Sequence, residues 1–298
     1  MKEIKKSKIR IKRDNKSKKY DDTLGITMEL EKSLTIDDEI EKEKKRINEK
    51  IKHKIVKNVM IITAIILVSL VVGFFLWLGN YYQTTEYASH YMLSNKLVDV
   101  RKTDDVLEFI PKSNNKNIGI VIYPSQKIKP MSYSRLSNIM AQYGYSVFIP
   151  RLRFNCSFLS KGLATDIINK NRDIRQWYLI GHSSSGEVAL KEAANEKRIQ
   201  GVIFLGTYPT GDDLKLINKP ALSIWGTKDG LLDLSNFNEY KNNMPQNAHY
   251  YEIVGGNNSD FADIKMIPGD NKAIIKPEKQ QKETLQQIIS FIEKSKEN

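Results

Sequence analysis

Three consecutive serines, Ser183 to Ser185, lie between Gly181 and Gly186, and only a sharp turn would let one of them do chemistry. The apolar run 177–181 ahead of them predicts a buried strand, and residues 186–197 predict a helix. A serine on a strand-to-helix turn projects its hydroxyl from the edge of a sheet, where the helix N-terminus favours negative charge. This context favours a nucleophile for acyl transfer, and a serine-rich helix N-cap is the alternative.

In the order Gly-x-Ser-x-Gly the nucleophile is Ser183. The fifth position holds Ser185, and Gly186 comes one residue later, so the motif is not strict. The fifth position needs a small side chain because helix and strand approach closely there. Serine is small enough to fit, at some packing cost.

The elements around the turn alternate between strands and helices. Apolar, β-branched runs predict strands, and amphipathic or charged segments between them predict helices. We expect strands at 97–102, 105–111, 117–124, 145–151, 177–181, 201–207, 221–227 and 250–256, and helices at 131–144, 163–173, 186–197 and about 278–294. Buried strands separated by helices indicate an α/β fold with a mainly parallel sheet covered on both faces.

These stretches together resemble the α/β-hydrolase superfamily, in particular a bacterial membrane-anchored group related to dienelactone hydrolases. The resemblance runs from about Tyr91 to Ile292 and implies the α/β-hydrolase fold. It is carried by VIYPSQKIKPMSYSRL, GYSVFIPRLRFN, GHSSSG, GTYPTGDDL, SIWGTKDGLLD and VGGNNSDFADI…GDNKAIIKPEKQQ.

The resemblance implies a role for several positions. Ser183 matches the nucleophile, and Asp229, after the strand 221–226, matches the triad acid; a turn-forming Asp-Gly pair is the alternative. The oxyanion would be held by the backbone N–H of Ser184 and by one from Ser125 or Gln126. Family members usually carry glycine after the proline of that loop.

The general base is the missing part of this site. The family's histidine follows a Gly-Gly-Asn stretch, and here Asn258 occupies that position. Asparagine cannot take a proton near neutral pH, so Ser183 would lack its base. Asp260 and Asp263 lie close in sequence, but an ordinary carboxylate pKa near 4 makes a poor base.

No other histidine is expected to replace the base. His53 precedes the apolar span described below, and His90 lies in an expected linker. His249 precedes the strand 250–256, which places it roughly 15–20 Å from the active edge at about 3.3 Å per residue. His182 adjoins Ser183, but neighbours on a sharp turn point apart, so we expect it to pack in the interior.

Residues 59–79 carry no charge and are long enough to cross a bilayer as a helix. Basic residues precede this segment, whereas NYYQTTEYASHY after it has none, so the N-terminus is expected in the cytoplasm and the remainder outside. Trp77, Tyr81 and Tyr82 would lie at the outer interface. A cleavable signal peptide is disfavoured because about 58 residues come first. The expected divisions are a basic, largely disordered tail at 1–58 with a charged helix at 37–57, a transmembrane helix at 59–79, a linker at 80–97 and a hydrolase domain at 98–298.

Composition limits the remaining function classes. The net charge is +12, and residues 1–58 hold 19 Lys and Arg against 12 Asp and Glu, or +7 of that excess. The membrane topology accounts for this tail, so nucleic-acid binding is not expected. The single cysteine, Cys156, excludes an intrachain disulfide, and no metal site or cofactor is expected.

Two principal hypotheses follow. One is a membrane-anchored extracytoplasmic serine hydrolase, cleaving an ester or similar acyl bond with Ser183. The other is a catalytically impaired relative that binds an ester-like ligand or a partner, because Asn258 replaces the base. A function located in the cytoplasmic tail is a third and weaker alternative. The bilayer and a small ester-like molecule are the expected partners; other protein partners stay open.

Overall fold

A computed structural model describes residues 21–295, except the side chains of residues 21–27, 78 and 238. The chain divides between Val71 and Val72 into two units. The disorder expected for residues 1–20 therefore lies outside the described residues.

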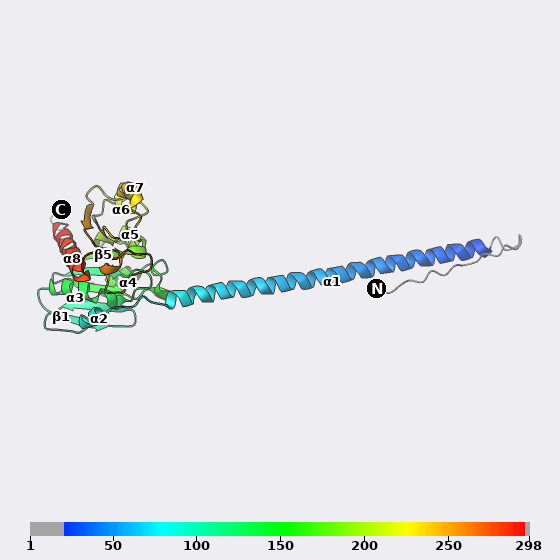
Figure 1. Cartoon of the computed structure of the whole chain (residues 1–298), viewed down its shortest axis with the longest axis horizontal. Coiled ribbons are helices and arrows are strands. Elements are labelled where there is room, and N and C mark those ends of the chain that lie inside the picture. Colours follow the sequence, from blue (N-terminus) through cyan, green and yellow to red (C-terminus); the bar gives the residue numbers. More distant parts are fainter. Residues whose placement is uncertain (1–20, 296–298) are drawn as a thin grey trace. The chain divides into compact units, whose positions relative to one another are not determined.

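The first described element is one long helix, α1, at Asp21–Gly79 (Figure 1). It contains both the expected charged helix and the expected apolar span. Disorder was expected up to residue 36, and for residues 21–36 this is wrong. Strong helix formers such as those in MELEKSL extend an existing helix without the cost of a new nucleus.

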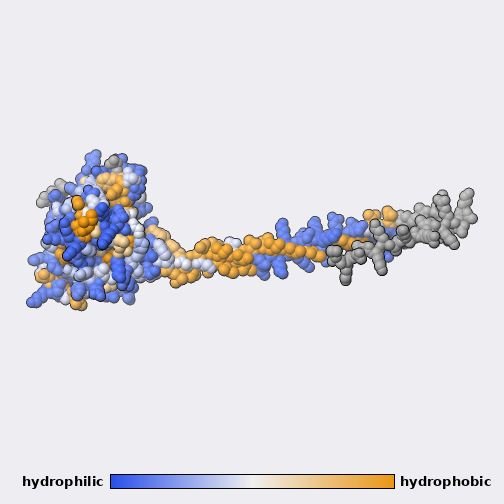
Figure 2. Space-filling view, in the orientation of Figure 1, coloured by the Kyte–Doolittle hydropathy of each residue, from blue (hydrophilic) through white to orange (hydrophobic). Residues whose placement is uncertain are grey.

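The apolar part of α1 is a candidate membrane span. Its most apolar 18-residue window within Met28–Trp77 has a mean hydropathy of 3.0, and none of that window is buried. Figure 2 shows these apolar residues as a band along the helix. Such a band left in water would be an unusually large exposed apolar surface.

The second unit is built on one eight-stranded sheet in the order β1-β2-β4-β3-β5-β6-β7-β8. β1 and β2 pair antiparallel with each other, β2 pairs antiparallel with β4, and every other neighbouring pair is parallel. The strands are β1 Val98–Lys102, β2 Val106–Pro111, β3 Ile118–Tyr123, β4 Ser146–Pro150, β5 Gln176–His182, β6 Ile199–Leu205, β7 Ala221–Gly226 and β8 His249–Ile253.

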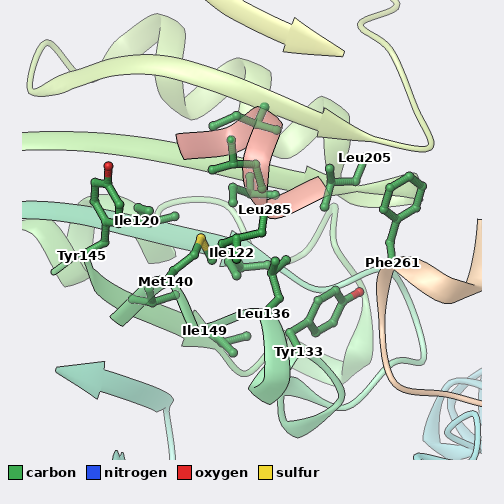
Figure 3. Close-up of a cluster of buried hydrophobic side chains, with 14 of the residues drawn as sticks. Ile120, Ile122, Tyr133, Leu136, Met140, Tyr145, Ile149, Leu205, Phe261 and Leu285 are labelled. Atoms are coloured by element: carbon green, nitrogen blue, oxygen red, sulfur yellow. The ribbon is translucent and has the colours of Figure 1, made fainter. Parts of the chain in front are cut away.

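Helices cover both faces of this sheet, as the sequence predicts. Side chains of α3 and α8 share one core cluster, and those of α4 and α5 share the other. Figure 3 shows part of the first cluster, including Tyr133 and Phe261. The helices are α2 Glu86–His90, α3 Ser134–Gln142, α4 Leu163–Lys170, α5 Gly186–Asn195, α6 Asp213–Leu216, α7 Phe237–Asn242 and α8 Pro277–Lys294, with 3₁₀ turns at Pro130–Tyr133, Arg153–Asn155, Ser183–Ser185, Leu234–Asn236 and Ser259–Phe261.

The segment 80–97, expected as a linker, packs against the sheet domain. The Tyr82 N–H donates to the Lys127 carbonyl at 2.9 Å, and the Thr85 N–H donates to the Asp263 carbonyl at 2.9 Å. Ala88 in α2 is fully buried. These contacts make the segment part of the domain, so a truncation at residue 86 would remove some of its packing.

Candidate active site

Ser183 lies on the turn between β5 and α5, as its sequence context predicts. Its φ of 47° lies in the left-handed region, which a residue with a side chain seldom occupies. The turn is tight: a Cβ added to Gly181 would lie 2.8 Å from the Cα of Gly186. Ser183 is half-buried, and its hydroxyl forms no hydrogen bond within residues 21–295.

Ser185, at the fifth motif position, is fully buried. Its hydroxyl donates to the carbonyl of Pro124, which directly follows β3. This hydrogen bond gives a partner to the buried hydroxyl of Ser185, the residue that occupies the position of the expected glycine. It also connects the turn to the start of the oxyanion loop. The close approach of strand β5 and helix α5, which a glycine at the fifth motif position usually allows, is here made possible by Gly181 and Gly186.

Asp229 follows β7 at the same edge of the sheet as Ser183. One carboxylate oxygen accepts the backbone N–H groups of Leu231 and Leu232, both at 2.9 Å. The other accepts from Nδ2 of Asn258 at 2.8 Å. Burial raises the pKa of Asp229 to about 6, and these hydrogen bonds oppose the rise. The group is therefore mostly ionised at neutral pH.

Asn258 follows β8 and is fully buried, at the position where the family carries histidine. Its Nδ2 donates to Asp229 and to the Gly206 carbonyl, the latter at 3.0 Å. Two acceptors facing the same nitrogen fix the orientation of the amide. Asn258 thus makes the hydrogen bond to the acid that a triad histidine would make, but it supplies no basic nitrogen.

Gly206 provides the space for this pair. Its φ is +57°, and an added Cβ would lie 2.4 Å from Nδ2 of Asn258 and 2.9 Å from Oδ2 of Asp229. Any side chain here would push the two residues apart. The residue after β6 therefore positions both the acid and the asparagine.

His182 is a buried hydrogen-bonding residue, which is more than the packing role expected from its sequence position. The Tyr133 hydroxyl accepts the Ser125 N–H at 2.9 Å and lies 2.7 Å from Nδ1 of His182. The backbone carbonyl and Oδ1 of Asn258, each 3.1 Å from Nε2, are both acceptors, so Nε2 carries the proton of the neutral ring and Nδ1 accepts from Tyr133.

This arrangement excludes His182 as a ready base. Burial lowers its pKa to about 4, so the ring is neutral at pH 7. Both ring nitrogens are hydrogen-bonded, and the rings of Tyr133 and Phe261 pack edge-on against it at 5.8 and 5.7 Å between centroids. A continuous buried chain thus runs from Ser125 through Tyr133, His182 and Asn258 to Asp229.

The expected oxyanion loop is close to the nucleophile turn, but its amides already have partners. The Gln126 N–H donates to the Ser184 hydroxyl at 3.0 Å. The Ser125 N–H donates to Tyr133. The two segments of the expected oxyanion hole therefore lie together. The Ser184 hydroxyl accepts the hydrogen bond from the Gln126 N–H that an oxyanion would need.

The other acidic residues behave differently from their sequence expectation. Burial raises the pKa of Asp260 to about 6 and raises that of Asp263, so an ordinary pKa near 4 is wrong for both. Asp263 pairs with the buried Arg135 at 2.9 Å. Within residues 21–295 neither carboxylate hydrogen-bonds to Ser183.

His249 begins β8 and so lies at the N-terminal end of that strand, whereas the candidate site lies at the carboxyl ends of the strands. His90 ends α2. Neither histidine is among the hydrogen-bonded site residues. His53 lies in α1. Within residues 21–295 no group of three His, Cys, Asp or Glu side chains could hold a metal ion.

Asp270 and Gln280 hold the two loops of the site, and sequence reasoning gave neither a role. Asp270 accepts the N–H and hydroxyl of Ser259 at 2.7 and 2.6 Å and the Gly230 N–H at 2.9 Å, so it bridges the acid loop and the asparagine loop. Gln280 accepts the Asn257 N–H and donates to its carbonyl. The only signal in the sequence was their place in the stretch GDNKAIIKPEKQQ, one of those that carry the family resemblance.

Comparisons with known proteins concern the family and the fold. A model of the alpha/beta hydrolase family matches residues 119–282. No curated protein matches the chain.

Two solved structures with a TM-score of 0.50 have the same fold at low identity. One of the metagenome-derived lipolytic enzymes LipS and LipT has a TM-score of 0.50 at 13% identity, over 66% of this chain and 100% of its own. A candidate lipase from Acinetobacter baumannii has a TM-score of 0.50 at 12% identity, over 72% and 95%. A candidate dienelactone hydrolase from Klebsiella pneumoniae has a TM-score of 0.47 at 12% identity, over 66% and 96%.

The strand order, the position of Ser183 after β5 and the family match over more than half of the chain together show that this protein belongs to the alpha/beta hydrolase family.

Proposed function

We propose that this protein is a serine hydrolase of low turnover. Ser183 attacks the acyl carbon of an ester or similar bond, its proton passes to water because no histidine base is present, and the alcohol leaves. Water then hydrolyses the acyl-serine and regenerates the hydroxyl. Membership of the family supports hydrolase chemistry. The observation that carries the proposal is the left-handed turn at Ser183, which costs energy and keeps the hydroxyl without an internal partner.

Asn258 limits the rate in this proposal. General-base catalysis contributes about 10²–10⁴-fold, and this site has no group to supply it. Asp229 and Asn258 still form the hydrogen bond of a triad, so the loss concerns proton transfer rather than the arrangement of the loops. Binding and oxyanion stabilisation leave about 10³–10⁴-fold over water in hydrolases that lack a triad member.

A second candidate function is ligand binding without turnover. It is favoured by the oxyanion loop, where the Gln126 amide is hydrogen-bonded to Ser184 and the Ser125 amide to Tyr133. An oxyanion would first have to displace the Ser184 hydroxyl. In that case the pocket would hold an ester-like ligand and release it unchanged.

Release of p-nitrophenol from a short-chain ester by the full chain in detergent separates the two candidates. The hydrolase proposal predicts slow turnover that disappears in Ser183→Ala and persists in the matched control Ser235→Ala, whose serine lies in the exposed turn before α7. Equal background rates in all three proteins would refute the hydrolase proposal for such esters and favour binding.

We also propose that α1 anchors the protein in a cell membrane, with the tail cytoplasmic and the hydrolase domain outside. The apolar band in α1 and the basic residues before it support this topology. A cysteine-accessibility assay tests it. A cysteine at residue 197 in a Cys156→Ser background should react with an impermeant maleimide on intact cells, and a cysteine at residue 45 should not.

A further inference from the structure

A cavity of about 380 Å³ lies outside the Ser183 site. It is formed where the ends of β1, β2 and β4 meet the loop after β3 and the segment after α1. Ser183, Ser184 and Asn258 are absent from its lining. The volume is in the range of small-ligand pockets.

The floor of this cavity is apolar and firmly held. Leu107 of β2 and Ile149 of β4 line it, are directly paired in the sheet and belong to the main core cluster. Val106 and Met131 extend the same surface. Such a floor favours a hydrocarbon over water.

Three cations come to the cavity from three different elements. Lys102 ends β1, Lys129 precedes the 3₁₀ turn at Pro130–Tyr133, and Arg151 directly follows β4. No acidic residue lines the cavity, and none of the three forms an ion pair in the part of the chain that the structure describes. The rim therefore carries three cations beside an apolar floor.

The cavity also adjoins the segment that leaves the candidate membrane span. Tyr81, two residues after the end of α1, lines it, and its hydroxyl donates to Oδ1 of Asn155. The Lys129 ammonium lies 5.3 Å from the Tyr81 ring centroid.

Aromatic and basic residues surround this junction. The Lys127 ammonium lies 4.3 Å from the Trp77 ring, and the ring of Phe75 lies 5.1 Å from that of Phe154. Phe154 itself is 64% exposed, in the 3₁₀ turn Arg153–Asn155 that follows the cavity residue Arg151. Aromatic rings and lysines are the residues that gather at the boundary between lipid and water.

We propose that this cavity binds an anionic phospholipid of the membrane in which α1 lies. The phosphate contacts Lys102, Lys129 and Arg151, and the first part of an acyl chain lies on the apolar floor. A free phosphate would leave the floor in water, whereas an uncharged hydrocarbon would leave the cations uncompensated. The inference rests on the proposed membrane anchoring and is independent of chemistry at Ser183.

Photo-crosslinking of the full chain in lipid nanodiscs tests the proposal. The probe is phosphatidylglycerol with a diazirine near the start of one acyl chain, and mass spectrometry locates the adducts. We expect adducts on peptides containing Met131 or Ile149. The variant Lys102→Gln/Lys129→Gln/Arg151→Gln should lose up to about 100-fold in affinity, from the contribution of each cation near an anionic surface.

The matched control is Arg172→Gln/Arg175→Gln/Lys197→Gln, which removes three exposed cations at the opposite edge of the sheet and should label as the wild type does. All six positions are exposed, so the melting temperature should not distinguish the two variants. Ser183→Ala should label normally, which separates this result from the hydrolase test.

Three outcomes would overturn the proposal. One is equal labelling of the two triple variants, and another is adducts confined to α1. The third is full displacement of the probe by inorganic phosphate, which would make the cavity a phosphate site and not a lipid site.

Discussion

Restoring the missing base is the most informative perturbation of this site. In Asn258→His, Nδ1 of the new ring takes the place of the Asn258 Nδ2 that now donates to Asp229 at 2.8 Å. Asp229, whose pKa is about 6, is ionised at pH 7.5 and holds the ring in that tautomer. Nε2 is then left to accept a proton from Ser183.

The surroundings set the size of the effect. A working base is worth about 10²–10⁴-fold in rate. The substitution loses the hydrogen bond to the Gly206 carbonyl and one of the two acceptors of His182, which keeps the backbone carbonyl at residue 258. The larger ring must also fit a fully buried position, so we expect a gain near 100-fold.

The assay is p-nitrophenyl ester hydrolysis by the full chain between pH 5 and 9. The Asn258→His rate should rise with pH as the new imidazole loses its proton, and Ser183→Ala added to it should abolish the gain. An unchanged rate in a folded Asn258→His protein would refute the placement of the base at residue 258. A gain that survives Ser183→Ala would refute the nucleophile.

Three further predictions follow from the contacts. Ser184→Ala frees the Gln126 amide and should raise the Asn258→His rate by up to about 100-fold, the value of one oxyanion donor; no change would place the oxyanion elsewhere. Ser183→Gly relieves the left-handed turn and should raise the free energy of unfolding by about 1 kcal/mol over Ser183→Ala in chemical denaturation, and equal stability would contradict the strain. The pKa of Asp229 is raised on folding from 3.8 to about 6, so its stabilising contribution is present below pH 4 and lost as pH rises through 6. Between pH 4 and pH 7 the wild type should therefore lose about 2 kcal/mol relative to Asp229→Asn, and parallel curves for the two proteins would show that the pKa is not raised.

Much of the sheet could be predicted from the sequence because its strands are short apolar runs bounded by turn residues. The runs 177–181 and 221–227 became β5 and β7, and this fixed the edge at which Ser183 and Asp229 lie. The start of α1 at Asp21 could not be predicted, because residues 21–36 become helical as an extension of the helix predicted at 37–57. The packing of residues 82–88 depends on the Lys127 and Asp263 carbonyls, which are distant in sequence.

The hydrogen bonds within the site were beyond sequence reasoning. Asn258 was assigned to the base position, but its bonds to Asp229 and His182 depend on how the loops after β7 and β8 meet. His182 was expected only to pack, because nothing local indicates that Tyr133 would reach it from another element. The Ser184 hydroxyl at Gln126 likewise depends on the approach of two loops.

The central claim is that Ser183 is an intact nucleophile whose base is missing. Its most direct test is the rate of covalent labelling by a fluorophosphonate, with the modified residue located by peptide mass spectrometry, in wild type and Asn258→His. The account predicts slow labelling confined to Ser183 in the wild type and labelling of the same residue about 100-fold faster in Asn258→His. Labelling of another residue, or no labelling of Ser183 in either protein, would contradict it.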